Sequence, residues 1–259
     1  MKKSTKVFGI IALIFAAAGI VLMVTGIALG GIKQSREVRF SGEIDIEETY
    51  TDVRSLDFDL GLSSVKIEEG DAFSIRGNRL PSNFTSKVKN GIWKIDADYY
   101  WMDWIGVGPL EEESTVVITL PKGTVLDSAD ISVGMGKLEL DTLNAGEIEL
   151  EAGAGEVKAD RLTGRIVDLS CGMGKISFGS ADVEKSLKAE CGMGSIEGEI
   201  HGKEDDYSYS IECGMGSVEL GSLKWGGFGK EEKQKVKKGS KELKAECGMG
   251  SISISFDEK

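Results

Sequence analysis

The chain of 259 residues is acidic, with 43 Asp and Glu against 31 Lys and Arg and a formal net charge of -12 at pH 7. This balance argues against nucleic acid as the general partner, because phosphate backbones are bound by clustered Lys and Arg. The chain has 35 Gly but only 3 Pro, which is unlike a disordered linker, since such chains are usually rich in both.

Residues 7–32 are predicted to cross a membrane as a single helix. This apolar, Gly-rich run of 26 residues carries no charge, and about 20 apolar residues are enough to span a bilayer core. We therefore expect residues 1–6 to form a cytoplasmic tip and the acidic remainder to lie outside the cytoplasm of a single-pass cell-membrane protein. A cleaved signal peptide is the alternative, with Ala28-Leu29-Gly30 as its processing site, although such peptides usually have an apolar region of about 7–15 residues.

A stalk and then β-structure are predicted after the membrane segment. Residues 33–53 are polar and are expected to form the stalk. Apolar and acidic residues then alternate over residues 56–60, which predicts a half-buried strand. A second strand at residues 115–120 ends at Pro121-Lys122-Gly123, a sequence typical of turns. We expect residues 54–127 to form an N-terminal β part.

Large aromatic residues gather at residues 93–104, inside the N-terminal β part. One interpretation is a cap over the open end of a β-array, because an uncovered end leaves strand edges free to pair. The other is a binding surface for carbohydrate or protein, for which Trp101 and Trp104 are the candidate contact residues.

A short repeat organises the second half of the chain. Cys-Gly-Met-Gly occurs four times, and variants precede it as Val133-Gly134-Met135-Gly136 and Ala152-Gly153-Ala154-Gly155. Counted from the first Gly of each copy, the intervals are 19, 19, 20, 22 and 34 residues. A fixed period of this length predicts a stacked array. The repeated side chains are Cys171, Met173, Cys191, Met193, Cys213, Met215, Cys247 and Met249.

Each repeat is predicted to be a strand, a Gly corner, a second strand and a turn. The alternation of apolar residues slips by one at Gly-Met-Gly, which requires a bulge or corner that Gly supplies by tolerating positive φ. Stacked copies should form a parallel β-solenoid (β-helix) with rungs of 19–22 residues, about 4.8 Å apart. The predicted fold is therefore all-β, with a repeat solenoid at residues 128–259 and one transmembrane helix before it.

Equivalent residues of the repeats should form columns along the solenoid. The four cysteines are expected in an interior column that Ala152 and Val133 continue, because such replacements are typical of a small buried residue. Disulfides between rungs remain an alternative that distances allow. A thiolate metal site is another, although its ligands would have to converge on a point. The methionines are expected to form a second column that fills space at the corner.

The interval of 34 residues contains an insertion at residues 224–239. Insertions in solenoids usually map to solvated loops, but this one is basic and aromatic in an otherwise acidic domain. It is therefore also a candidate contact for anionic lipid or a wall polymer. The candidate contact residues are Trp225, Phe228, Lys230, Lys233, Lys235, Lys237 and Lys238.

No residue cluster identifies a reaction, and no catalytic residue, cofactor or metal ligand is predicted. His201 is the one histidine of the chain and lies in a turn-like His-Gly-Lys, which is typical of a surface residue. Three glutamates share one outward position on successive rungs, where lysines, solvent or a bound cation such as Ca²⁺ could offset their repulsion. They are Glu190, Glu212 and Glu246, with Lys188 and Lys244 on the same face.

The turn and the first repeats resemble a known family. Residues 118–123, followed by the Gly-x-Gly units at Gly134 and Gly153, are similar to the DUF4097 group, whose members are described as adhesins. The resemblance covers roughly residues 40–256. It implies a β-helical domain of the bacterial envelope, often behind an N-terminal membrane segment, and it offers no catalytic residues to carry over. The chain departs from the group by its Met and Cys residues around the Gly pair and by the insertion.

Together these features predict a membrane-anchored, extracytoplasmic binding or scaffolding module without catalytic activity. Its expected partner is an envelope polymer or a membrane protein. The alternative is a regulatory or sensory partner of an envelope stress or signalling protein. A polysaccharide-active enzyme is a third hypothesis, because β-helices can host such enzymes although a fold does not confer an activity.

Overall fold

The computed structural model describes residues 43–61, 64–81, 83–97, 115–226, 232–236 and 239–257, and of residues 232–236 it describes only the backbone. All of these residues belong to one unit. The predicted membrane segment at residues 7–32 lies outside them. Among the residues that are described, no helix has the length and apolar character needed to cross a membrane.

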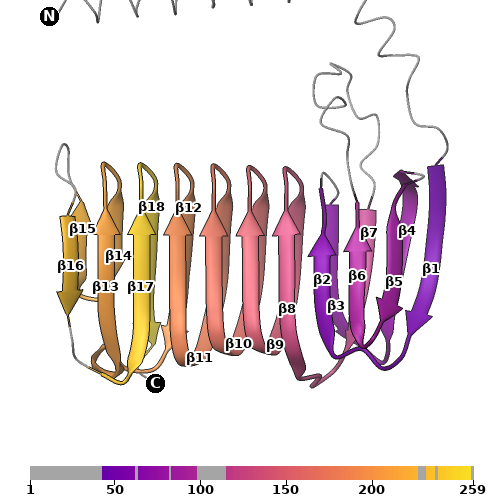
Figure 1. Ribbon diagram of the computed structural model, residues 1–259, viewed down its shortest axis with the longest axis horizontal. Helices are drawn as coiled ribbons and strands as arrows, with labels where there is room; N and C mark the ends of the chain where they lie inside the picture. Colours follow the sequence, from indigo (N-terminus) through magenta and orange to yellow (C-terminus); the bar gives the residue numbers. More distant parts are fainter. Residues whose placement is uncertain are drawn as a thin grey trace, which may run out of the picture. The chain divides into compact units, whose positions relative to one another are not determined.

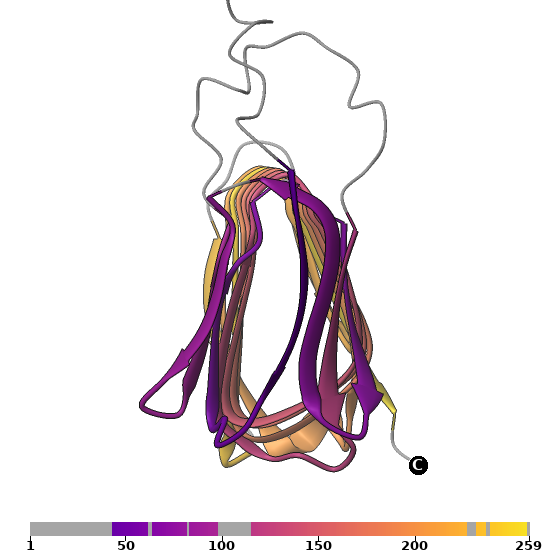
Figure 2. The ribbon, with the colours of Figure 1, turned by 90° about the vertical axis from the view of Figure 1, so that its right-hand side faces the viewer.

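Two walls of β-strands face each other and enclose the core (Figures 1 and 2). Strands of the first wall, in spatial order, are β5 (Thr85–Lys89), β6 (Ile92–Asp96), β2 (Ser55–Asp59), β8 (Leu126–Val133), the C-terminal halves of β9 (Lys137–Ala152), β10 (Glu156–Cys171) and β11 (Lys175–Cys191), then β17 (Lys241–Cys247), β13 (Tyr207–Cys213) and β16 (Glu232–Val236).

The second wall begins with β1 (Glu43–Tyr50), β4 (Phe73–Pro81), β7 (Thr115–Pro121) and β3 (Ser64–Gly70), and continues through the N-terminal halves of β9, β10 and β11 to β12 (Ser195–His201), β18 (Ser251–Asp257), β14 (Ser217–Leu220) and β15 (Leu223–Gly226). A 3-10 helix at Glu204–Asp206 precedes β13. The all-β solenoid predicted from the repeats is confirmed for the described part of the chain.

Alternating side chains of both walls fill the space between them. In β10, for example, Val167, Leu169 and Cys171 point inward and are at most 2% exposed. Equivalent inward positions of the second wall hold Leu, Val and Ile interchangeably, and all are buried: Leu138, Val157, Ile176, Ile196, Ile252 and Val218. Burial of apolar area therefore decides these positions, and residue shape is secondary.

The middle of the solenoid is parallel, and both ends are closed by antiparallel pairs. At one end β5 pairs with β6, and β1 with β4. At the other end β16 pairs with β13, and β15 with β14. These strands cover edges that would otherwise offer free backbone groups to other chains.

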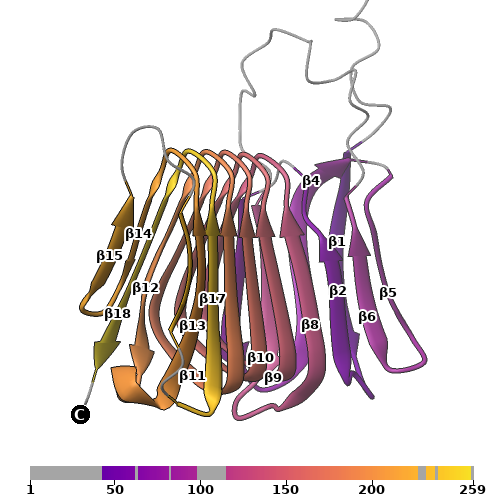
Figure 3. The same ribbon diagram turned by 60° about the vertical axis from the view of Figure 1, so that its left-hand side comes forward.

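The order of the rungs differs from the order of the sequence. β17 and β18, the last strands of the chain, lie between β11–β12 and β13–β14 (Figure 3). The same exchange occurs at the other end, where β2 and β3 lie between β6–β7 and β8–β9. At the C-terminal end the chain builds the outer rung first and then returns inside it, which explains the long interval before the last repeat. At the other end the inner rung, β2 and β3, comes first in the chain.

Two expected boundaries are wrong. Glu43–Tyr50, assigned to a polar stalk, forms strand β1 and pairs with β4. No boundary separates residues 54–127 from residues 128–259, because β2 pairs with β8 and β3 with β9 across it. Alternating polar residues suggested a stalk, but an end strand exposes one of its faces.

The Gly-Met-Gly corner is confirmed, but the expected reason for its glycines is wrong. Among the described residues, none of these glycines has a positive φ. At Gly134 and at both glycines of every later copy, the backbone of a neighbouring rung lies too close for a side chain. A Cβ on Gly172 would lie 2.7 Å from the carbonyl oxygen of Gly153. Hydrogen bonds between the rungs hold the two backbones this close. The Met193 and Gly194 amides, for example, both donate to the Gly172 carbonyl, at 2.8 and 3.1 Å.

Candidate binding surfaces

The cysteine column lies inside the corner and is confirmed as buried. In spatial order it contains Cys171, Cys191, Cys247 and Cys213, which are free thiols at most 4% exposed. Burial raises the pKa of Cys171 and raises that of Cys247 to about 11, and neighbouring cysteines add to the rise. Cys171 and Cys247 are therefore protonated at neutral pH, and all four buried thiols belong to the core.

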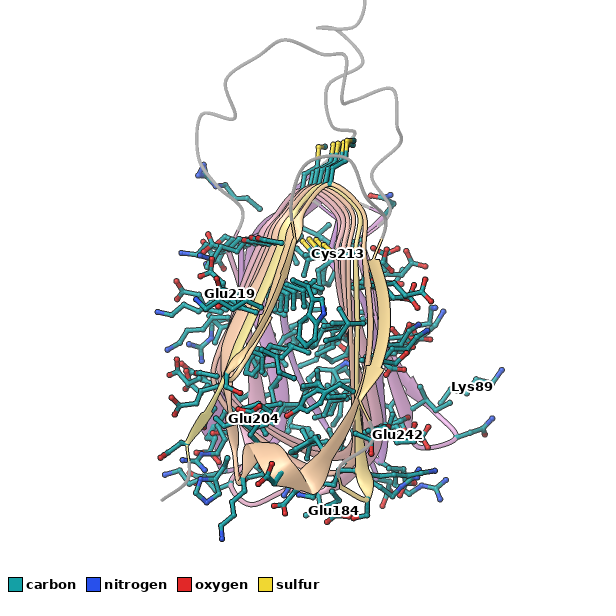
Figure 4. The ribbon with its side chains drawn as sticks, turned by 90° about the vertical axis from the view of Figure 1, so that its left-hand side faces the viewer. Lys89, Glu184, Glu204, Cys213, Glu219 and Glu242 are labelled. Atoms are coloured by element: carbon teal, nitrogen blue, oxygen red, sulfur yellow. The ribbon has the colours of Figure 1, made fainter. Side chains whose placement is uncertain are left out.

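The methionine column lies on the outer side of the same corner. A row of sulfur atoms stands outside the tip of the walls in Figure 4, and a second row lies beneath it at Cys213. The expectation that the methionines fill space is wrong, because their exposed fractions range from 44 to 64%. The members are Met135, Met173, Met193, Met249 and Met215.

An acidic column crosses the outer face of the first wall. Register places Asp57, Asp130, Glu149 and Asp168 side by side on β2, β8, β9 and β10. Partial burial raises the pKa of the last three, and the charges of neighbouring carboxylates raise it further, most clearly at Glu149 between Asp130 and Asp168. Repulsion therefore accumulates in the middle of this acidic column.

Lysines lie at both ends of the acidic column. Lys94 on β6 forms an ion pair with Asp57 at 3.2 Å. Its positive charge also opposes the rise in the pKa of Asp130. Lys188 on β11 follows Asp168 in register, and Lys244 on β17 follows Lys188. Along this column the outer face of the first wall is thus acidic in the middle and basic at both ends.

The glutamates predicted on successive rungs are offset by lysines. Lys188 pairs with Glu190 at 2.8 Å, and Lys244 pairs with Glu246. The lysine holds the pKa of Glu246 below its ordinary value. In space, Glu246 lies between Glu190 and Glu212. Of the three sources of compensation considered from the sequence, which were lysines, solvent and a bound cation, the structure shows the lysines.

The insertion at residues 224–239 supplies strands β15 and β16, so the expectation of a loop thrown out between rungs is wrong. Trp225 lies on β15 opposite Val218 and packs half-buried against the core. Lys233 and Lys235 lie on β16, opposite Glu212 and Ser210. Phe228, Lys230, Lys237 and Lys238 lie outside the described residues. The described part of the insertion is an end cover, which the basic composition did not suggest.

An aromatic cluster occupies the other end of the described solenoid. Trp93 is fully buried, with ring centroids of Tyr50 at 4.9 Å, Phe58 at 5.3 Å and Phe73 at 6.3 Å. The Trp93 indole and the Tyr50 hydroxyl both donate to Ser86 Oγ, at 2.9 and 2.8 Å. Trp93 is therefore a core residue at this end and not an exposed contact residue. Sequence reasoning missed Tyr50, and Trp101 and Trp104 lie outside the described residues.

Two further features bear on chemistry. A pocket lined by Glu69, Leu120 and Asn144 has a volume of about 60 Å³, whereas sites for drug-sized ligands usually measure about 300–1,000 Å³. His201 is exposed at the end of β12, as predicted. Within the described ranges, no three His, Cys, Asp or Glu side chains are arranged to hold a metal ion.

Comparison with known proteins gives a family and several distant folds. The family model described as Toastrack DUF4097 matches residues 41–197. No curated protein matches the chain. A solved structure of a candidate cell adhesion protein from Clostridium sporogenes is 16% identical, with a TM-score of 0.44, over 83% of this chain and 100% of that one.

Two other solved structures are similarly distant. A candidate adhesin from Bacteroides fragilis is 11% identical, with a TM-score of 0.37, over 83% of this chain and 97% of its own. A candidate lipid-binding protein from Parabacteroides distasonis is 16% identical, with a TM-score of 0.32, over 85% and 96%. Identities this low leave the function to be argued from the residues of this chain.

Proposed function

The chain belongs to the Toastrack DUF4097 family, and from this premise we propose that it is a non-catalytic binding or scaffolding module, anchored by residues 7–32 and exposed outside the cytoplasm of a bacterial cell. The proposed partner is a cationic group on an envelope polymer or membrane protein. The outer face of the first wall is the proposed contact surface.

The acidic column is the observation that supports this function. Stacked rungs produce extended surfaces on which equivalent side chains repeat, so a solenoid suits a partner that is itself extended. Partial burial raises the pKa of Glu149, and repulsion from Asp130 and Asp168 raises it further. A cationic partner would relieve that repulsion, and complementary charge favours both encounter and specificity.

Charge neutralisation on one wall at a time tests this proposal. The first variant combines Asp130→Asn, Glu149→Gln and Asp168→Asn. The matched control removes three carboxylates from the second wall by Glu139→Gln, Glu197→Gln and Glu219→Gln, with the same change in net charge. Binding of the full-length chain to isolated bacterial envelopes is measured by co-sedimentation.

We expect the first variant to lose at least tenfold in envelope binding and the control to retain it. Equal binding by the two variants would reject the first wall as the contact surface. Cross-linking to one stoichiometric membrane protein, lost in the same variant, would identify the partner as a protein instead of a polymer.

The anchor is supported by composition alone, since residues 7–32 contain no charge and exceed the length of about 20 residues that a bilayer core requires. Deletion of these residues should move the protein from the membrane fraction to the soluble fraction. Protease added to intact cells should degrade the β-domain. Protection of the domain until the cells are lysed would show the opposite orientation.

A further inference from the structure

The exposed methionines stand on consecutive rungs. Backbone hydrogen bonds of 2.8 Å run from the Met193 amide to Gly172, from the Met249 amide to Gly192, and from the Met215 amide to Gly248. Met173, Met193, Met249 and Met215 are therefore neighbours in that order, and they form three adjacent pairs. Met135 is separated from them by the rung of Ala154, whose amide donates to Gly134.

Methionine occupies this position on five rungs, with Ala154 on a sixth, while the neighbouring residues vary. Met135 is present where Val133 replaces the cysteine, and the residue after the second Gly is Lys in some repeats and Ser in others. Inward columns, which need only apolar area, mix Leu, Val and Ile. The outer methionine column contains no Leu, Val or Ile. On the four consecutive rungs its side chains are 55–64% exposed, so burial of apolar area does not explain the choice of methionine.

We propose that this methionine column binds a soft monovalent cation, Cu(I) or Ag(I), between the thioethers of neighbouring rungs. Thioether sulfur is a soft ligand that selects Cu(I) over hard cations. A bond from Zn²⁺ to cysteine sulfur is about 2.3 Å long. With metal–sulfur bonds of that order, an ion held linearly between two sulfurs spans about 4.6 Å. Neighbouring rungs repeat at about 4.8 Å, and the flexible methionine side chain closes the difference.

Glycines on both sides of each methionine support this site. They keep the corner narrow, since a Cβ on either glycine would meet the rung beneath it. No side chain of the flanking glycines therefore stands between neighbouring thioethers at the corner. The cysteines lie on the inner side of the corner and are at most 4% exposed, so they are not part of the proposed site. The site does not depend on the function proposed above.

The test uses the full-length chain in detergent, labelled with ¹³C at the methionine methyl groups. Ag(I) nitrate, a redox-stable probe for Cu(I), is titrated in chloride-free buffer, and methyl chemical shifts are followed by NMR. The methyl groups of Met173, Met193, Met249 and Met215 should shift together at up to three equivalents of Ag(I). Met135 should not shift, because its neighbour is Ala154, and Met1, Met23 and Met102 are further references.

Two variants make the test sharper. Met193→Leu keeps an apolar side chain but isolates Met173, so the Met173 shift should disappear while Met249 and Met215 still respond. Ala154→Met joins Met135 to the column, and the Met135 methyl should then shift. The variants preserve the fold if their circular dichroism and their midpoints of urea unfolding match those of the wild type.

Three results would overturn the proposal. One is a column that shows no methyl shift at a tenfold excess of Ag(I). Another is a Met135 shift in the wild type equal to that of Met193, which indicates binding by any exposed thioether. The last is a Met193→Leu variant that responds like the wild type, which indicates an apolar surface without sulfur-specific binding.

Discussion

At the residue scale, close stacking of backbones explains the Cys-Gly-Met-Gly repeat. The first glycine lies against a glycine carbonyl of the preceding rung, and the second lies against both a carbonyl and the cysteine of that rung. The cysteine points in and the methionine points out. A separate physical reason thus explains the residue type at each of the four positions. Only the two glycine positions exclude every larger side chain.

Gly194→Ala should destabilise the protein. Its Cβ would lie 2.7 Å from Cys171 Sγ and also press on the carbonyl of Gly174. Overpacking of this kind costs about 1–3 kcal/mol, which urea unfolding of the two proteins would measure. The control is Met193→Ala at the neighbouring exposed position, where we expect a change within about 0.5 kcal/mol. Equal stabilities of the two variants would contradict the stacking explanation.

The cysteines should resist alkylation until the protein unfolds. Iodoacetamide at pH 8 without reductant is expected to modify none of the four thiols in the folded chain and all four in urea, as counted by mass spectrometry. Buried thiols at most 4% exposed and without disulfides are the reason. Modification of the folded protein would show that the corner opens readily, and two unreactive thiols in urea would show a disulfide.

The pKa of Cys247 predicts a loss of stability at alkaline pH. Burial raises this pKa from 9.0 to about 11. The folded state therefore holds the proton more tightly than the unfolded state. Its contribution is fully present below about pH 9 and is lost as the pH rises through about 11. The melting temperature should fall more steeply over this range for the wild type than for Cys247→Ala, and identical slopes would contradict the assignment.

At the element scale, parallel strands in register convert single surface residues into charged columns. Asp130, Glu149 and Asp168 come from three consecutive strands, and Asp57 comes from β2, which is distant in the sequence. Their strands are held together by the buried core, so the carboxylates cannot move apart. The carboxylates on this surface therefore repel one another, and the stability gained from the buried core offsets that repulsion.

Neutralisation of the acidic column should stabilise the free protein. The variant with Asp130→Asn, Glu149→Gln and Asp168→Asn removes like charges whose repulsion is worth about 1 kcal/mol, equivalent to about 2–4 °C in melting temperature for a domain of this size. Calorimetry at pH 7 and low salt would detect the rise. Glu139→Gln is the opposing control, because Lys137 lowers the pKa of Glu139 and its loss should not stabilise.

The pH dependence of this effect has a definite sign. The folded-state pKa values of Asp130, Glu149 and Asp168 lie above 3.8, 4.5 and 3.8 respectively. Their contribution to stability is fully present below these unfolded values and is lost as the pH rises through the folded ones. The difference between the variant and the wild type should be largest at pH 7 and shrink toward pH 4. A constant difference would show that charge is not its cause.

At the scale of the whole described unit, the two ends decide whether the solenoid stays separate from other chains. Repeats that stack on one another would stack equally well on a second molecule. Antiparallel strands β1, β5, β15 and β16 cover both ends. Because of the rung exchange, β13 and β14 pair with the covering strands β16 and β15, although β17 and β18 are the last strands of the chain.

Trp225→Pro should increase self-association. Proline removes an amide from β15 and conflicts with the pairing of Trp225 opposite Val218 on β14. The exposed edge of β14 would then be free to pair with another chain. Light scattering at increasing protein concentration would detect the association. Trp225→Val is the control, because valine suits a strand; equal scattering by both variants would show that β15 does not protect the edge.

The repeat interval and the alternation of apolar residues determined the all-β solenoid, the corner and the buried cysteines. These follow from local periodicity, because a strand that buries every second residue must find a neighbour of the same pattern. The replacement of cysteine by Ala152 and Val133 was enough to predict a core position. The insertion and the aromatic segment were also identified from composition, although not their strand pairings.

Only the tertiary structure decided which rungs are neighbours, which way the methionines point and why the glycines are needed. Alternation assigns a side chain to a face only while the strand continues, and the strand ends at the corner. Met193 therefore points outward although Cys191 points inward. The order of the rungs depends on which strands pair. Because the repeats are nearly identical, the sequence does not distinguish one pairing partner from another. Period is a local property of a chain, whereas neighbourhood and exposure are properties of the assembled stack.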